Sequence, residues 1–157
     1  MSGTVENKLA ELGVTLPAPA AAAANYVPYV ISGNMVFVSG QITMLDGELQ
    51  YLGTVGDDLT LDDGIAAARI CAINLIAQVK EACGGDLDRV KRVVKLGGFV
   101  NCTAEFTDHP KVINGASDLI ADAFGEAGKH ARFAVGAPSL PLGIAVGLMI
   151  VLAWPLA

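Results

Sequence analysis

Charge is absent from the C-terminal end of this chain. After Arg132 the sequence contains no Asp, Glu, Lys, Arg or His through to Ala157. A guanidinium stays charged at every pH that a protein meets, and burying it without a partner is costly. If Arg132 is at least partly buried, it therefore needs an anion, which is either a carboxylate of the protein or one that a ligand brings.

Charged residues are scarce along the whole chain, at 17% of 157 residues, while hydrophobic residues make up 53%. The net charge of −6 gives no electrostatic footprint for nucleic acid, so we expect no nucleic-acid partner. The basic residues within 89–95 alternate with apolar ones, which indicates the solvent side of a structured element. A chain this apolar is expected to bury surface against copies of itself.

Patterns for disulfides and metal sites are also lacking. The cysteines Cys71, Cys83 and Cys102 are odd in number and lack metal-ligand spacing, so we interpret them as small buried hydrophobes. His109 and His130 have no ligand partner at a suitable spacing, and we infer no metal and no cofactor. No secretory signal precedes the first predicted helix, and reduced thiols suit a cytoplasmic location.

The uncharged run 140–157 raises the question of a membrane span. Pro141 and Pro155 interrupt this run, Gly143 and Gly147 lie between them, and no Lys or Arg follows. The segment 144–152 instead has the length and bulk of a strand buried on both faces. We therefore expect no membrane span.

The first half of the chain predicts a short helix followed by hairpins. Asp46-Gly47 is a turn dipeptide, and Ser32-Gly33-Asn34 is a second turn signal between two apolar runs. The predicted elements are a helix over 4–13, a surface connection over 17–24, strands over 26–31 and 35–39, and a small hairpin arm near 44–52.

Two long helices are predicted in the second half. Thr60 and Asp63 resemble a capping box, and Gly84-Gly85 ends the helix that it begins. Gly97-Gly98 within a strand suggests a bulge or a close approach. The predicted elements are a helix over 61–82, a strand over 88–101, a helix from Asp108 or Pro110 to Gly125 or Gly128, and strands over 132–137 and 144–152.

The resulting order, β-β-α-β-α-β-β after the first helix, predicts an α+β fold with the helices on one face of a mixed sheet. No internal repeat or linker marks a second domain. We therefore expect one domain over 1–157, in which 1–25 is an N-terminal helix and extension.

The motifs resemble those of a known family. The segment 33–41, Gly-Asn-Met-Val-Phe-Val-Ser-Gly-Gln, resembles the N-terminal signature of the YjgF-like, or Rid (reactive intermediate deaminase), family. His130-Ala131-Arg132 followed by Leu140-Pro141 resembles the second signature, and Asn114 falls where the family has an Asn on its second long helix. The resemblance spans 26–151. The amino-acid sequence at 114–117 and 125–126 is similar to that of a subgroup of the family without a settled activity.

The resemblance implies a chorismate-mutase-like fold that assembles as a homotrimer with clefts between its subunits. It further implies that an Arg holds the carboxylate of a small 2-imino acid, which is hydrolysed to a 2-oxo acid and ammonia. By position, the ligand-binding residues would be Arg132, Ser39, Tyr26 and Asn114. Candidate lining residues are Phe133, Cys102 and His130.

Each of these residues also has a plainer interpretation. Arg132 could pair with a protein carboxylate, Ser39 could be a small residue at a strand end, and Tyr26 could simply pack. Asn114 could be a surface amide, and Cys102 and Phe133 could be packing residues. His130 is an alternative proton carrier, because imidazoles titrate near neutrality.

One departure from the family bears on catalysis. The family's last strand commonly carries a Glu that holds the attacking water, and ungapped counting from Leu140-Pro141 puts Gly147 at that position. No catalytic residue is therefore assigned: another group acts as base, water attacks unassisted, or the chain is a non-catalytic carboxylate-binding or sensor protein. The family's association with endoribonuclease activity and translation inhibition is disfavoured by the net charge.

Overall fold

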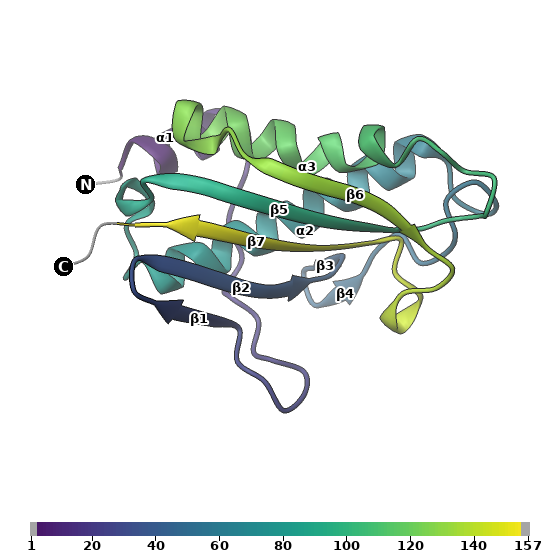
Figure 1. Ribbon diagram of the computed structural model, residues 1–157, viewed down its shortest axis with the longest axis horizontal. Coiled ribbons are helices and arrows are strands. Elements are labelled where there is room, and N and C mark those ends of the chain that lie inside the picture. The colour runs from purple at the N-terminus through teal and green to yellow at the C-terminus, as the bar shows by residue number, and fades with distance from the viewer. Residues whose placement is uncertain (1–2, 155–157) are drawn as a thin grey trace.

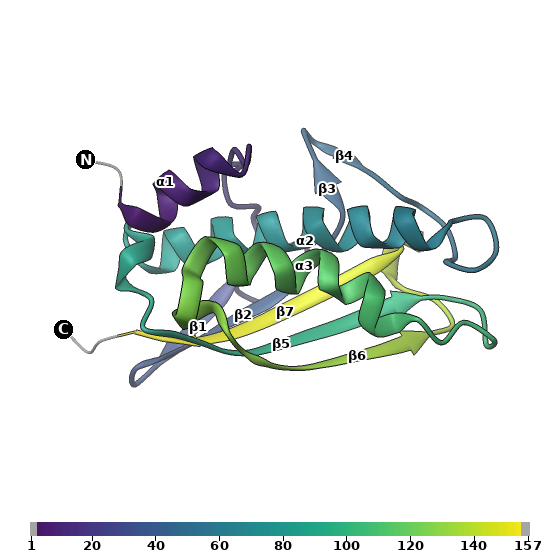
Figure 2. The ribbon, with the colours of Figure 1, turned by 90° about the horizontal axis from the view of Figure 1, so that it is seen from above.

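The structure, a computed structural model, describes residues 3–154. A five-stranded sheet forms one layer, and the two long helices cover one of its faces (Figures 1 and 2). The sheet order is β1-β2-β7-β5-β6; β5 and β6 are parallel, and the other neighbours are antiparallel. The strands of this sheet are β1 (Tyr29–Ser32), β2 (Met35–Gln41), β5 (Arg92–Asn101), β6 (Ala131–Ala137) and β7 (Val146–Ala153).

The remaining elements surround this core. A short helix packs near the end of the second long helix, and a two-stranded hairpin stands beside the first (Figure 2). These elements are α1 (Thr4–Glu11), β3 (Met44–Leu45), β4 (Glu48–Leu49), α2 (Leu61–Ala82) and α3 (His109–Phe124), with 3-10 turns η1 (Leu87–Arg89), η2 (Gly125–Gly128) and η3 (Pro141–Gly143). The predicted α+β fold and mixed sheet are confirmed.

Helix α2 has the predicted bounds. The Thr60 side chain accepts a hydrogen bond from the Asp63 N–H, and the Asp63 carboxylate accepts one from the Thr60 N–H, which completes the capping box. The apolar face of the helix is buried on the sheet, with Cys71, Leu75 and Ile76 fully buried.

Helix α3 crosses α2 at close range because of a glycine. A Cβ on Gly115 would overlap the backbone oxygen of Ile65 in α2, so only glycine allows this approach. With Gly115 turned toward α2, its neighbours Asn114 and Ser117 face strand β6 instead, where both contact the same side chain. The helix–helix contact thereby sets the rotation of α3.

The two faces of the sheet differ in what covers them. Side chains such as Val36, Leu96 and Ile150 are buried beneath the helices. On the opposite face Phe37, Phe99 and Val135 remain 44%, 41% and 43% exposed. This uncovered face is largely apolar, with Lys95 lying over the Phe133 ring at 5.4 Å from its centroid.

Several predicted boundaries were displaced. Strand β1 begins at Tyr29, after Pro28, because a proline cannot donate to a ladder hydrogen bond. Residues 87–89 form the turn η1, so β5 begins at Arg92. Of the two alternatives predicted for Gly97-Gly98, a bulge or a close approach, the structure has the close approach, and the register shift of β5 lies instead between Val93 and Lys95. A Cβ at those glycines would meet Phe133 and Ile113 respectively.

The uncharged C-terminal segment forms β7, which lies between β2 and β5. Within residues 3–154, no helix is long and apolar enough to cross a membrane. All three cysteines are free and buried, as predicted.

Candidate functional site

Arg132 lies on β6, an edge strand, and its side chain reaches onto helix α3. The Nη1 group donates to Asn114 Oδ1 at 2.8 Å and to Ser117 Oγ at 3.1 Å, and Nη2 donates to the Pro110 carbonyl at 3.1 Å. Positions 110, 114 and 117 share one face of a helix, since side chains three and four apart are neighbours. The guanidinium thus lies along a single stripe of α3.

Every described acceptor of Arg132 is a neutral oxygen. Over residues 3–154 the ion pairs join Lys8 to Glu11, Lys80 to Glu6, Lys111 to Asp108 and Lys129 to Glu126, and none includes Arg132. A guanidinium has five N–H donors. The three hydrogen bonds use at most three of them, and none uses Nε.

Ser117 links Arg132 to His130. The Gly128 carbonyl can only accept, so His130 Nδ1 carries a proton and donates to it at 2.6 Å. In the neutral ring Nε2 is then an acceptor, and we assign the Ser117 hydroxyl as its donor at 2.9 Å. The hydroxyl therefore donates to His130 while it accepts from Arg132.

The sequence motifs did not identify Ser117. Its signal was its spacing from Asn114, because a residue three positions along a helix shares the same face. Asn114 was predicted to bind ligand, and its described contact is the one to Arg132. His130, a candidate lining residue, contacts the same network through Ser117.

Ser39 and Tyr26 lie at the other edge of the sheet. The Ser39 hydroxyl donates to the Val27 carbonyl at 2.7 Å, and its N–H donates to the Pro28 carbonyl at 2.9 Å. Tyr26 is half exposed. Three strand spacings separate β2 from β6, about 14 Å, so one chain does not bring Ser39 and Arg132 together.

The remaining lining candidates also lie apart from the guanidinium. Phe133 follows Arg132 along β6 and points to the opposite face, where its ring packs edge-on against Phe99 with 5.3 Å between centroids. Cys102 Sγ contacts His109 Nε2 at 3.3 Å, and burial raises the pKa of this thiol.

Gly147 lies on the uncovered face of β7, opposite Phe99 in β5. A Cβ at this position would meet no heavy atom within 4 Å. A side chain could therefore be accommodated there, although the chain supplies none.

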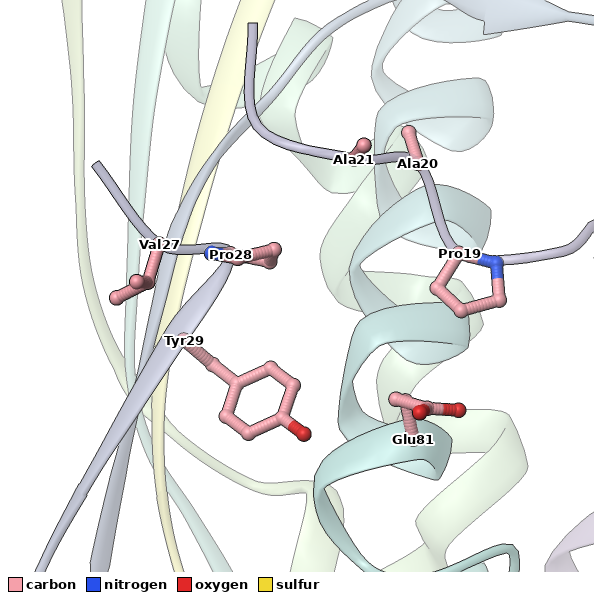
Figure 3. A pocket seen from close by; sticks show the side chains of 7 residues that line it. All are labelled: Pro19, Ala20, Ala21, Val27, Pro28, Tyr29 and Glu81. Carbon is pink, nitrogen blue, oxygen red and sulfur yellow. The ribbon is translucent and has the colours of Figure 1, made fainter. Parts of the chain in front are cut away.

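A pocket of about 470 Å³ lies between the 17–24 connection, the start of β1 and the end of α2 (Figure 3). Figure 3 shows the Tyr29 hydroxyl pointing toward the side that Glu81 occupies, with Pro19 and Pro28 forming apolar walls. Arg132, Ser117 and His130 do not line this pocket.

Comparisons with known proteins relate this chain to a family. The sequence model described as "YjgF/chorismate mutase-like, putative endoribonuclease" matches residues 6–154. Protein TCP17 of Trypanosoma cruzi is 53% identical over 146 residues, which cover 92% of this chain and 91% of that protein.

Two solved structures are similar over nearly the whole chain. The protein Atu1372 of Agrobacterium tumefaciens, described as of unknown function, is 47% identical with a TM-score of 0.92, covering 97% of this chain and 93% of that one. A protein of Shewanella oneidensis, described as a "putative endoribonuclease", is 41% identical with a TM-score of 0.93, covering 96% and 99%.

Proposed function

The chain belongs to the YjgF/chorismate mutase-like family, and from that premise we propose that it binds a small 2-oxo or 2-imino acid in clefts between the subunits of a homotrimer. The ligand carboxylate is held by Arg132. Hydrolysis of the imine to a 2-oxo acid and ammonia is the reaction that such a cleft would perform.

The observation that carries this proposal is the state of the Arg132 guanidinium. Its orientation is fixed by three neutral oxygens, its charge is met by no described carboxylate, and at least two N–H donors remain. Two donors on one planar group are what a carboxylate accepts bidentately. Between the two anions first considered for Arg132, this favours the one brought by a ligand.

A second copy of the chain would complete the cleft. Ser39 and Tyr26 lie near the β1–β2 edge, and Arg132 lies at the β6 edge, so a head-to-tail contact between copies would bring them together. Closing that contact into a ring of three would also cover the apolar face that carries Phe37, Phe99 and Val135.

A non-catalytic carboxylate binder is the second candidate, and Gly147 favours it. Because glycine has no side chain at this position, the last strand provides no carboxylate there to activate water. Endoribonuclease activity, which the family description names, is not supported by a net charge of −6.

Titration calorimetry with 2-oxobutanoate tests the binding proposal. We expect saturable binding that Arg132→Ala weakens by at least about tenfold, the worth of a charge-assisted hydrogen bond. Arg92→Ala, at an exposed arginine of β5, is the matched control and should bind as the wild type does. Light scattering should give a mass of about 48 kDa, three times the chain mass of 16.1 kDa. Equal affinity in wild type and Arg132→Ala would refute the proposal.

A further inference from the structure

The chain has no acid where its family commonly places the water-activating Glu, but it holds another base beside Arg132. In the neutral ring His130 Nε2 is the acceptor nitrogen, because Nδ1 donates to Gly128. The Gly128 carbonyl orients the ring through this bond, and Gly128 is itself closely packed, since a Cβ there would clash with the backbone of Ile120 and Ala121. A base whose second nitrogen is oriented by a third group is the usual arrangement for drawing a proton from a hydroxyl.

The Ser117 hydroxyl has one unused hydrogen-bond acceptor site among the described contacts. A hydroxyl donates once and accepts twice. Its proton goes to His130 Nε2, and one lone pair accepts from Arg132 Nη1. The second lone pair has no described partner, and it lies on the oxygen that also contacts the anion-binding guanidinium. A water bound beside the ligand carboxylate could donate to that lone pair.

We propose that Ser117 and His130 form a proton relay that activates the hydrolytic water in place of the missing carboxylate, an inference that rests on the function proposed above. The water gives a proton to Ser117 Oγ as Ser117 gives its own proton to His130 Nε2. The hydroxide adds to the carbon of the protonated imine, and the C=N π electrons move to nitrogen, which gives a neutral carbinolamine. His130 then returns the proton through Ser117 to the amino nitrogen. The C–N bond breaks and ammonia leaves as the carbinolamine hydroxyl gives its proton through Ser117 to His130 and C=O forms. His130 finally releases that proton, which the protonated imine brought, to solvent water.

Arg132 assists the relay as well as binding the carboxylate. Its Nη1–H donates to the oxygen that passes the proton, so the hydroxyl is held between cation and base. The other charges near His130 in sequence, Lys129 and Glu126, pair with each other at 2.7 Å. Arg132 is thus the cation that shares the relay hydroxyl.

The test separates turnover from binding. The imine is generated in the assay by an amino-acid oxidase, ammonia release above the spontaneous rate gives kcat, and calorimetry with 2-oxobutanoate gives Kd. Ser117→Ala and His130→Gln should lower kcat by about 10²-fold or more, the usual range of general-base help. Their Kd should rise by no more than about fivefold, the effect of one ordinary hydrogen bond.

Matched variants exclude a merely structural effect. Ser139→Ala and His109→Gln change a serine and a histidine outside the network and should keep wild-type kcat. Ser117→Thr retains the hydroxyl and should recover most of the lost kcat. Added imidazole should restore turnover in His130→Ala.

The outcomes distinguish this relay from the proposed function. Ammonia release no faster than the spontaneous rate, together with Arg132-dependent binding, would overturn the relay and leave a carboxylate binder. Wild-type kcat in Ser117→Ala, or no rescue by threonine or imidazole, would also overturn it. A Kd for 2-oxobutanoate that Arg132→Ala leaves unchanged would instead overturn the proposed function.

Discussion

The two edges of the sheet both carry polar side chains, but they hold them differently. At the β6 edge, Arg132 is held by side chains and a carbonyl of α3, and it keeps unused donors. At the β1–β2 edge, the Ser39 hydroxyl is already bound to the Val27 carbonyl. The β6 edge thus keeps unused N–H donors on a guanidinium, whereas the other edge offers a hydroxyl whose proton is committed to the backbone and which can only accept.

The difference follows from the elements behind each edge. Strand β6 lies along α3, so side chains from a helix can reach a strand residue. Strand β1 is preceded by irregular chain, and its hydroxyl contact is to backbone. We expect ligand recognition to be sensitive to the first edge and stability to the second.

The largest expected effect lies at the β6 edge itself, where Ser117→Ala should lower kcat by about 10²-fold or more. Gly147→Glu placed in that background should not recover the lost turnover, because Gly147 lies on the uncovered face of β7, whereas Ser117 and Arg132 meet on the face that α3 covers. Ammonia release measures both effects, with Gly147→Gln as the control. Recovery by Glu and not by Gln would show that a carboxylate on β7 reaches the reacting water.

Gly115→Ala should disturb the β6 edge by displacing helix α3, which packs against it. The new Cβ overlaps the Ile65 oxygen, and overpacking of this kind costs about 1–3 kcal/mol of unfolding free energy. The displaced α3 would also carry Asn114 and Ser117 away from Arg132. Urea unfolding and calorimetry measure both effects, and Gly147→Ala, where a Cβ meets nothing, is the control. An unchanged denaturation midpoint would contradict the close approach.

Arg132→Lys keeps the charge at the β6 edge but removes the planar fork. An ammonium cannot bond Asn114, Ser117 and Pro110 while presenting two donors to a carboxylate. The Kd for 2-oxobutanoate should rise by about tenfold with little change in melting temperature. Affinity equal to wild type would mean that charge alone suffices.

Ser39→Ala should give the smallest effect, at the opposite edge. Loss of the 2.7 Å bond to Val27 should cost about 1 kcal/mol of unfolding free energy and lower the melting temperature by about 2–4 °C. The Kd for 2-oxobutanoate should change less than in Arg132→Lys. A larger loss of affinity than that would place Ser39 in direct contact with the ligand, as the family resemblance implied.

Local signals in the sequence were sufficient for the long elements. The capping box at Thr60 and the glycine pair at 84–85 define α2 because both act within a few residues. Arg132 was identified because it is the last charge before an apolar segment. Ser117 was missed because its role depends on β6 lying along α3, and the parallel pairing of β5 with β6 was not predicted. The separation of Ser39 from Arg132 likewise depends on strand order.

The parallel β5–α3–β6 unit affects which parts of the protein unfold locally and which do not. Arg132 and its partners at 110, 114, 117, 128 and 130 all fall within 23 positions of one another along the chain. Cooperative opening units tend to follow such supersecondary segments. Local unfolding of the β1–β2 hairpin would thus leave the hydrogen bonds around Arg132 intact. Amide hydrogen exchange should be fast in β1, while α3 and β6 stay protected.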